Sequence, residues 1–336
     1  MHFSFPAFVR FGLGGTSGLL VLLWWGVAAR SSANAQEVPV ATSSSGSSTG
    51  VRKLAPDVLE VIPPSAQWGD TALGPVNLPL VAEHPELQWT PNYFPVSDTL
   101  IRKASQVTFR TDVYCLEFAF KPVRMIEVEV PTAEGLENKT VWYLLYRVRY
   151  LGGDLHPVPE PDKYENEVFG NPQAVSSEWV RFLPTFHLDT LGLGLKYLDQ
   201  VIPVAKAAIE RKERVGLPVH DTLQIQTVRI ERSTPEDDHP VWGVAMWTDV
   251  DPRVDFFSVV VGGLTNAQQI EQTEEGGLRY PQKRLVLNFW RPGDTIDEVE
   301  DRIRFGVPAI SDAARQRYVL AKYGLSERLD YYWDYR

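Results

Sequence analysis

The feature that most constrains the fold of this chain is a two-residue alternation of side-chain character between Val141 and Tyr150. The even positions of the run are all apolar, and they are Trp142, Leu144, Tyr146, Val148 and Tyr150. Arg147 and Arg149 lie at odd positions, opposite this apolar row. Successive side chains of a strand point to opposite faces, so the run predicts a β-strand with one face in the core.

Further short apolar runs follow residue 107 and predict more strands. They span residues 116–120, 126–130, 180–188, 223–230, 241–248, 256–264 and 284–290. Thr132 to Lys139 is typical of a hairpin loop, and Pro184 indicates an edge strand or a bulge. Residues 296–306 fit either a short helix or a strand around 303–305.

Two segments interrupt the alternation and predict helices. Residues 203–214 begin with Pro203, which suits a first helical turn, and Gly216 is the expected stop. Their expected buried face consists of Val204, Ala205, Ala208 and Ile209. Near the C-terminus, Ser311 is the expected N-cap and Gly324 the expected C′ residue of a second helix. An aromatic tail follows this helix, and we expect it to pack onto a sheet or a partner.

Short strands, hairpin-like loops and two peripheral helices predict a mainly β protein built as an antiparallel, immunoglobulin-like β-sandwich. The helix near 203–214 would connect two sandwich units, residues 95–215 and 216–310. Residues 311–336 would form the C-terminal helix and the aromatic tail. One large sandwich with a helical crossover is the alternative.

Residues 1–35 have the pattern of a secretory signal peptide. Arg10 supplies a positive charge, residues 18–29 are apolar, and Ala33-Asn34-Ala35 is a small-residue cleavage site. The alternative is an uncleaved membrane anchor at residues 11–29. Residues 36–50 predict a flexible Ser/Gly linker, and residues 51–94 an extended arm rich in Pro and Trp. We therefore expect an exported protein, periplasmic or extracellular, with no membrane insertion after cleavage.

Charge and cysteine content narrow the expected partners. The formal net charge is −10, and it becomes more negative when Arg10 and Arg30 leave with the signal peptide. Such acidity disfavours nucleic acid and anionic lipid. Cys115 is the only cysteine, so no disulfide can form within the chain, and we expect a buried, unreactive thiol.

Several stretches together resemble an uncharacterised family of exported, β-rich proteins from planctomycete bacteria. They are Lys53-Leu-Ala-Pro-Asp-Val-Leu59, Trp89-Thr-Pro-Asn-Tyr93, residues 116–128, residues 251–259, Gly263-Leu-Thr-Asn266 and residues 287–294. The similarity runs from about residue 51 to the C-terminus. It implies an envelope or secreted location and brings no activity, cofactor or catalytic residue with it.

Carboxylates offer two candidate sites. Asp249, Asp251 and Asp255 form the densest acidic cluster, and oxygen ligands at this spacing could hold calcium. The alternative is a strand connection in which Arg253 neutralises the acids. Glu117 with Glu127 or Glu129 is the candidate acid pair for sugar hydrolysis, which requires carboxylates about 5–10 Å apart.

His187 and Asp189 are a third candidate, because alternate residues of a strand share a face. Such a pair could begin a metal site or orient a general base, although no further ligand or nucleophile is recognisable. His156, His220 and His239 lie beside Pro or Asp in expected loops and are expected to be exposed to solvent. No cofactor other than the calcium ion considered above is expected.

Tryptophans are the candidate ligand-binding residues, because exposed aromatic rings can stack on sugars. Trp242, Trp247 and Trp290 are the candidates. Trp242 and Trp247 differ in parity, so at most one of them faces the interior of a regular strand. The alternative is that these side chains belong to ordinary aromatic cores.

Three functions are therefore considered. The first is an exported, non-enzymatic β-sandwich protein of the cell envelope that acts through protein or envelope contacts. The second is a carbohydrate-binding module that uses exposed Trp and Tyr side chains. The third is a hydrolase with an unrecognised acid pair. The expected partner is an envelope protein or a polysaccharide.

Overall fold

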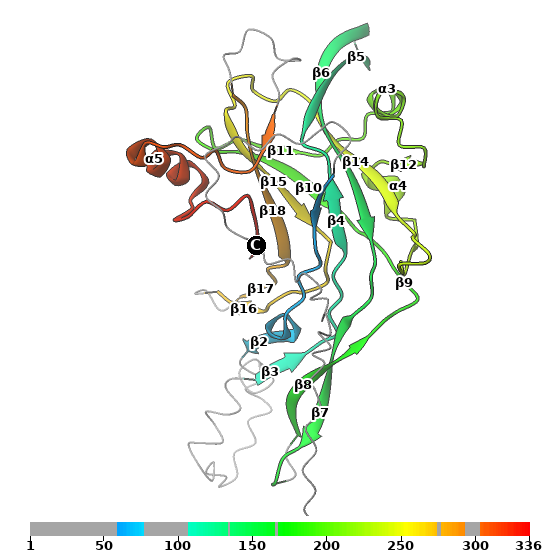
Figure 1. Ribbon diagram of the computed structural model, residues 1–336, viewed down its shortest axis with the longest axis vertical. Coiled ribbons are helices and arrows are strands. Elements are labelled where there is room, and N and C mark those ends of the chain that lie inside the picture. The colour runs from blue at the N-terminus through cyan, green and yellow to red at the C-terminus, as the bar shows by residue number, and fades with distance from the viewer. Residues whose placement is uncertain (1–58, 77–106, 134, 165–166, 274–276, 293–302) are drawn as a thin grey trace, which may run out of the picture. The chain divides into compact units, whose positions relative to one another are not determined.

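The computed structural model describes residues 59–76, 107–133, 135–164, 167–273, 277–292 and 303–336 (Figure 1). The predicted signal peptide or anchor, the linker, and the arm residues 51–58 and 77–94 lie outside this part of the chain. What is described is mainly β and contains several antiparallel sheets, which confirms the coarse fold class. None of the described helices is both long and apolar enough to cross a membrane.

The first sheet has the strand order β1-β4-β6-β14-β12, and β5 also pairs with β6. Its strands are β1 (Glu60–Ile62), β4 (Glu117–Phe120), β5 (Arg124–Thr132), β6 (Gly135–Arg149), β12 (Val219–His220) and β14 (Val241–Trp247). All pairs are antiparallel except β12 with β14. Part of the predicted arm therefore adds strand β1 to this sheet.

The second sheet has the order β11-β10-β15-β18-β19, and β20 also pairs with β18, at residues 283–287. Its strands are β10 (Thr185–Thr190), β11 (Lys196–Leu198), β15 (Phe256–Gly262), β18 (Lys283–Trp290), β19 (Arg304–Phe305) and β20 (Tyr331–Tyr335). The aromatic tail is thus strand β20, packed on a sheet as expected. Residues 304–305 form strand β19, which agrees with the strand that was one of two structures predicted within 296–306.

Four two-stranded ribbons complete the described strands. They pair β2 (Ala72–Val76) with β3 (Val107–Arg110), β7 (Asp154–Pro161) with β8 (Glu167–Val175), β9 (Trp179–Val180) with β13 (Ile230–Glu231), and β16 (Glu271–Gln272) with β17 (Leu278–Arg279). The β9–β13 ribbon aligns Trp179 with Glu231. This ribbon borders the candidate site described below.

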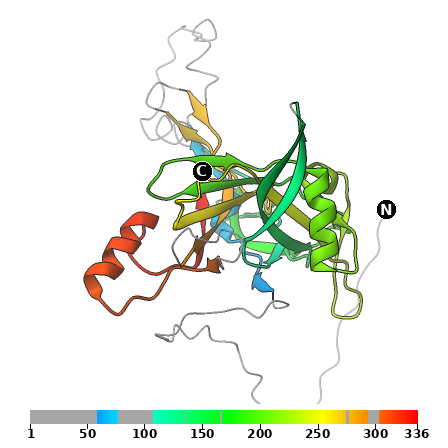
Figure 2. The same ribbon diagram turned by 90° about the horizontal axis from the view of Figure 1, so that it is seen from above.

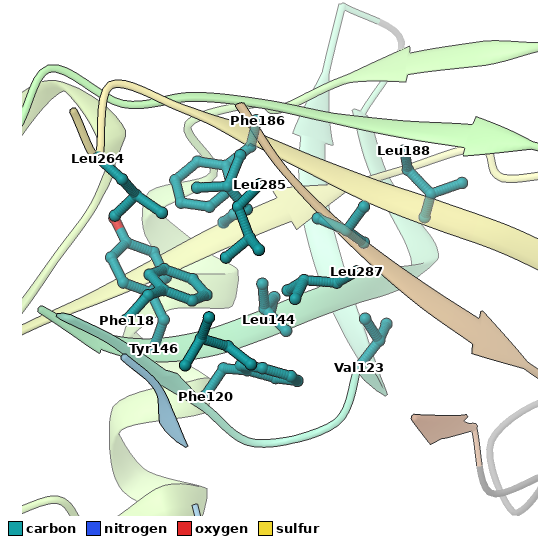
Figure 3. Close-up of a cluster of buried hydrophobic side chains, with 14 of the residues drawn as sticks. Phe118, Phe120, Val123, Leu144, Tyr146, Phe186, Leu188, Leu264, Leu285 and Leu287 are labelled. Atoms are coloured by element: carbon teal, nitrogen blue, oxygen red, sulfur yellow. The ribbon is translucent and has the colours of Figure 1, made fainter. Parts of the chain in front are cut away.

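The two six-stranded sheets share one hydrophobic core (Figure 3). Tyr146 of the first sheet stacks on Phe118 with ring centroids 5.4 Å apart, and it lies 4.9 Å from Phe186 of the second sheet. The predicted inward row of 142–150 is buried in this core, which confirms the alternation. Aromatic rings bury a large area each, so this layer supplies much of the driving force for folding.

The predicted division into two sandwich units near residue 215 does not describe these sheets. Strand β6 pairs with β14, and β10 pairs with β15, so each sheet combines strands from both predicted units. Pairing across the division satisfies backbone groups that would otherwise form open sheet edges. All described residues belong to one compact unit, residues 48–336.

Helix α3 (Pro203–Glu213) covers the outer face of the first sheet. Pro203 starts the helix as predicted, but Arg214, in a left-handed conformation with φ 48°, ends it before Gly216. Ala205 and Ile209 are buried as predicted, whereas Val204 is exposed, so its predicted place on the buried face was wrong. The odd residues Val141, Tyr143 and Leu145 of β6 also pack under α3, so this strand is buried on both faces.

The end of α3 carries a buried charge network. The carboxylate of Glu213 accepts hydrogen bonds from the Tyr143 hydroxyl at 2.7 Å, Lys121 Nζ at 3.0 Å and Arg124 Nη1 at 2.8 Å. Burial raises the pKa of Glu213, but the hydrogen bond from Tyr143 and the charges of Arg124 and Lys121 outweigh it and leave the pKa below its ordinary value. The network ties α3 to β4, β5 and β6.

Two other local predictions were wrong, and a third was right except for the length of a loop. Residues 223–230 begin with helix α4 (Thr222–Ile225) because the Asp221 carboxylate accepts hydrogen bonds from the N–H groups of Leu223 and Gln224 at 3.0 and 2.8 Å. The hairpin predicted around 132–139 is present as β5–β6, but its connection is a tight turn in which Thr132 pairs with Gly135, whose φ of 138° suits glycine. Pro184 precedes β10, which pairs on both sides and is therefore not an edge strand.

The C-terminal helix α5 (Ala313–Tyr323) lies on the other side of the sheets from α3 (Figure 2). Its N-cap is Asp312 and not Ser311, because the Asp312 carboxylate accepts a hydrogen bond from Arg315 N at 2.7 Å. Gly324 ends the helix with φ 67°, as predicted. The turn η1 (Trp68–Thr71) is the remaining described helical element.

A buried polar cluster joins η1 to the C-terminal strand. Asp70 accepts hydrogen bonds from Lys283 Nζ at 2.5 Å and from the Tyr335 hydroxyl at 2.7 Å. Lys283 Nζ also donates to the Ser65 carbonyl at 2.6 Å. The neighbouring Cys115 thiol is buried, as predicted, and burial raises its pKa to about 11. This thiol is therefore protonated at neutral pH and a poor nucleophile.

Candidate functional site

The three predicted calcium ligands do not form a site. Asp249 is exposed and lies 3.1 Å from Lys139 Nζ, whereas Asp251 pairs with Arg253 at 2.7 Å. That pairing lowers the pKa of Asp251 to about 2. The Asp255 side chain is exposed. Within the described ranges no group of three or more His, Cys, Asp or Glu side chains is placed to hold a metal ion.

The predicted acid pair of a hydrolase is not brought together either. Glu117 lies opposite Arg149 of β6, and Glu127 lies opposite Thr140 of the same strand. Nine residues of a strand span about 30 Å, far beyond the separation that glycoside hydrolysis needs. The Glu117 carboxylate is instead bound by Arg149, whose Nε and Nη2 lie at 2.7 and 2.9 Å.

The three candidate tryptophans occupy different environments. Trp247 is fully buried in the core shared by the two sheets. Trp242 has the opposite parity and packs partly buried on the side of α3, so only one of the two faces that core, as predicted. Trp290 is partly buried, and the Arg304 guanidinium lies 5.1 Å from its ring centroid. They therefore do not form one aromatic row.

His187 and Asp189 do share a face of β10, as predicted. Their closest atoms, Nε2 and Oδ1, are 3.6 Å apart, and both side chains are largely buried. Burial lowers the pKa of His187, and the nearby positive charges of Lys196, Arg284 and Arg336 lower it further, against the opposing effect of Asp189. The imidazole is therefore neutral at neutral pH.

A polar pocket among the described residues lies elsewhere, where residues 176–179 meet residues 229–239. Its volume is about 610 Å³, within the range of small-ligand sites. It is lined by Ser176, Ser177, Glu178, Trp179, Arg229, Glu231, Arg232, Thr234 and His239. The pocket is shallow, and most of these side chains are exposed.

Backbone contacts hold these segments together. Arg232 N donates to the Glu178 carbonyl at 3.0 Å, and Gly153 N donates to Ser176 Oγ at 3.0 Å. Gly152 has φ 75°, and a Cβ at this position would lie 2.4 Å from Ser176 Oγ and 3.1 Å from Arg232 Cδ. Only glycine therefore lets the two pocket walls approach this closely.

A buried pair supports the pocket from below. The Tyr150 hydroxyl donates to Asp154 Oδ2 at 2.5 Å and accepts a hydrogen bond from Ser177 N at 2.8 Å. Burial, together with the hydrogen bond to Asp154, raises the pKa of Tyr150 to about 12, so the hydroxyl stays protonated. This pair fixes the backbone at Ser177 and so the direction in which the segment enters β9.

The indole of Trp179 is the only large apolar side chain of the pocket, and it is 38% exposed. The guanidinium of Arg229 lies 4.6 Å from its ring centroid, and that of Arg181 lies 5.8 Å away. Stacked arginines hold an indole in one orientation. The aromatic surface is therefore oriented before any ligand arrives.

Donors and acceptors surround this indole. His239 Nε2 lies 3.0 Å from Asp237 Oδ2, and His239 Nδ1 lies 3.7 Å from Glu231 Oε2. Within the part of the chain that the structure describes, the guanidinium of Arg232 and the carboxylate of Glu178 make no hydrogen bond or ion pair. The pocket thus offers both hydrogen-bond donors and hydrogen-bond acceptors to a ligand.

Sequence reasoning did not single out this pocket. Val180 and Phe182 are buried, so the alternation of a strand places Trp179 on the outward face. This alternation was the sequence feature that could have pointed to Trp179. His239 was expected in an exposed loop, yet it is partly buried and lines the pocket. Nothing in the sequence indicated that residues 176–179 and 229–239 meet.

Comparison with known proteins adds no relative: no protein-family model, no curated protein and no solved structure matches this chain.

Proposed function

We propose that this chain is an exported, non-enzymatic protein of the cell envelope that binds a saccharide in the pocket around Trp179. The observation that carries the proposal is an exposed, pre-oriented indole inside a shallow pocket lined by hydrogen-bond donors and acceptors. Sugar rings have apolar faces that stack on aromatic rings and hydroxyls that both donate and accept hydrogen bonds. The proposal keeps the predicted carbohydrate-binding function and moves it away from Trp242, Trp247 and Trp290.

The finer fold assignment is part of this proposal. We interpret the two sheets that share a core as an antiparallel β-sandwich of the immunoglobulin-like kind. Support comes from the antiparallel pairing within both sheets and from the interdigitating aromatic rings between them. The parallel pairing of β12 with β14 departs from the purely antiparallel pattern.

Export and family membership rest on the sequence. The signal-peptide pattern of residues 1–35 and the resemblance to exported planctomycete proteins support a periplasmic or extracellular location. A polysaccharide partner fits this compartment, and the acidic chain disfavours nucleic acid. An envelope protein is the competing partner, and hydrolysis of the sugar is the third hypothesis.

The test is co-sedimentation of the purified protein with insoluble envelope material of its host, before and after protease treatment. We expect retention on protease-treated material, because the ligand is a polysaccharide. Retention only on untreated material would mean a protein partner and would overturn the proposal. Release of soluble sugar during the incubation would instead favour the hydrolase hypothesis.

Substitution of Trp179 locates the site. Trp179→Ala should abolish retention, and Trp179→Phe should retain most of it because the aromatic face remains. Trp290→Ala is the matched control, since Trp290 is also partly exposed and also has an arginine over its ring. Equal retention of the Trp179→Ala and Trp290→Ala proteins would place the ligand elsewhere.

A further inference from the structure

The outer face of the second sheet carries a cluster of charged side chains that the proposed saccharide pocket does not use. Residues opposite each other in antiparallel strands share a face. His187 is opposite Val260, Val260 is opposite Val286, and Val286 is opposite Tyr332, so one row crosses β10, β15, β18 and β20. Asp189 lies one pair further along β10, and Arg284 precedes Val286 on the same face of β18.

The floor of this cluster is apolar. Val260 and Val286 are both fully buried, although they lie on the face of the sheet that points away from the core. Charged groups above an apolar floor interact more strongly than in water, because the local dielectric constant is low. Lys196 and Arg336 at the rim remain accessible, with side-chain exposures of 68% and 36%.

The charges of the cluster are close together but poorly paired. Asp189 lies 3.6 Å from His187 Nε2, 3.6 Å from Lys196 Nζ and 3.7 Å from Arg336 Nη1, and none of these contacts is a hydrogen bond. Arg336 is held from the other side, because its Nε donates to Asp334 at 2.9 Å and its Nη2 donates to Tyr332 at 3.0 Å.

Two buried polar atoms in this cluster lack any hydrogen-bond partner among the described residues. They are Asp189 Oδ1, an acceptor, and Arg284 Nε, a donor. The guanidinium of Arg284 likewise makes no ion pair within the described ranges. Buried polar groups are nearly always satisfied in folded proteins, so an unsatisfied donor and acceptor on one face point to a missing partner.

We propose that this face binds a small hydroxy-carboxylate, of the uronic acid class, whose carboxylate lies between Arg284 and Arg336. In this arrangement the guanidinium groups donate to the carboxylate, and a hydroxyl of the same molecule donates to the Asp189 carboxylate. Lys196 adds positive charge at the rim. The neutral imidazole of His187 supplies a further hydrogen-bonding group beside Asp189.

The charge balance of the cluster selects a monoanion. Lys196, Arg284 and Arg336 face the two carboxylates of Asp189 and Asp334, which leaves one positive charge while His187 is neutral. Planar guanidinium groups match the planar carboxylate. Phosphate is instead typically bound by helix N-termini or by runs of backbone N–H groups, and this face consists of paired strands whose amides are already bonded. Two carboxylates outnumbered by three cationic side chains also disfavour a metal ion.

The proposal is independent of the Trp179 pocket, because Trp179 lies on β9, which is not a strand of this sheet. It is therefore tested in the full-length Trp179→Ala protein, so that sugar binding at the first site cannot contribute. Isothermal titration calorimetry with D-glucuronate is compared with D-glucose, which lacks the carboxylate, and with acetate, which lacks the hydroxyls. We expect glucuronate to bind, acetate to bind more weakly and glucose to give no heat.

Substitutions then place the ligand. Arg284→Gln and Asp189→Asn should each weaken glucuronate binding about 10-fold to 100-fold, the usual effect of removing a hydrogen bond to a charged group. Arg211→Gln, the same change at an exposed position on α3, should leave the affinity unchanged. Thermal unfolding verifies that the variants are folded, and Lys196→Gln at the exposed rim gives a further test if either of them unfolds.

Three outcomes would overturn the proposal. They are glucuronate binding no tighter than glucose, equal affinity of the Arg284→Gln and Arg211→Gln proteins, and inorganic phosphate binding more tightly than glucuronate. The last result would identify an oxyanion site that is not selective for a carboxylate. None of the three bears on retention at the Trp179 pocket, so the two proposals fail separately.

Discussion

Charged side chains on the outer faces of the two sheets differ in how closely they are paired. On the first sheet, the Glu213 side chain is 2% exposed and accepts hydrogen bonds from Tyr143, Lys121 and Arg124 at 3.0 Å or less. On the second sheet, Asp189 meets three bases at 3.6–3.7 Å without a hydrogen bond. The first arrangement holds helix α3 on a sheet. In the second, the Asp189 carboxylate keeps hydrogen-bonding capacity for the proposed ligand.

The largest expected effect is on the first sheet. Glu213→Gln removes the negative charge that Lys121 and Arg124 share in a buried position, and breaking a buried ion pair costs about 3–5 kcal/mol. The free energy of unfolding, measured in urea by tryptophan fluorescence, should fall by that amount. Glu210→Gln on the exposed side of the same helix is the control and should change it by less than about 0.5 kcal/mol. A loss below 1 kcal/mol for Glu213→Gln would remove the contrast between the sheets.

The apolar contact of α3 comes next. Ile209 is fully buried between α3 and the first sheet, so Ile209→Ala should lower the free energy of unfolding by about 2–4 kcal/mol. Val204→Ala, one turn earlier and exposed, should be nearly neutral. Equal effects of the two substitutions in the same urea titration would mean that α3 is not anchored as described.

A carboxylate between the sheets gives a pH dependence. Asp199 accepts a hydrogen bond from Met246 N at 2.6 Å and another from the Thr222 hydroxyl. Burial raises its pKa to about 6 against these hydrogen bonds. The folded state therefore holds this proton more tightly than the unfolded state does, so its contribution to stability grows as the pH falls from about 6 to 4 and is lost as the pH rises again.

The Asp199→Asn protein tests this sign. The free energy of unfolding of the parent protein minus that of the variant should be larger at pH 4 than at pH 7. The expected increase is about 2–3 kcal/mol, since each pKa unit corresponds to about 1.4 kcal/mol. Chemical denaturation at a series of pH values gives this difference. A difference that does not vary with pH, or that grows toward pH 7, contradicts the prediction.

The smallest expected effect is on the second sheet. Arg284 makes no ion pair among the described residues, so Arg284→Gln should change the free energy of unfolding by no more than about 0.5 kcal/mol. Differential scanning calorimetry of the ligand-free protein measures this change. A loss above 2 kcal/mol would show that the charges of this face stabilise the fold, as those of the first sheet do.

Local features of the fold were predictable from the sequence where one property dominated. The even positions of 142–150 are buried because no other arrangement of a strand hides five apolar side chains in a row. Pro203 and Gly324 mark a helix start and a helix end because their backbone preferences act locally. The strand predicted at 223–230 was wrong because Asp221 caps a helical turn there. This cap acts locally and outweighs the alternation of apolar residues.

The candidate sites depend on contacts that the sequence does not encode locally. His187 and Asp189 were predicted to share a face, but Arg284 and Arg336 join them only through the pairing of β10, β15, β18 and β20. The Trp179 pocket needs the turn at Gly152, the end of β8 and the segment after β13. Strand order and strand register bring the residues of both sites together. Strand order and register do not follow from the spacing of residues along the chain.

The bond between Asp70 and Tyr335 sets a condition on when this protein can finish folding. Its two residues are 265 positions apart, and Tyr335 belongs to the last strand of the second sheet. Contacts this distant in sequence form late, because a long loop must close first. The sheet therefore stays incomplete until the residues of β20 have been synthesised and can reach Asp70.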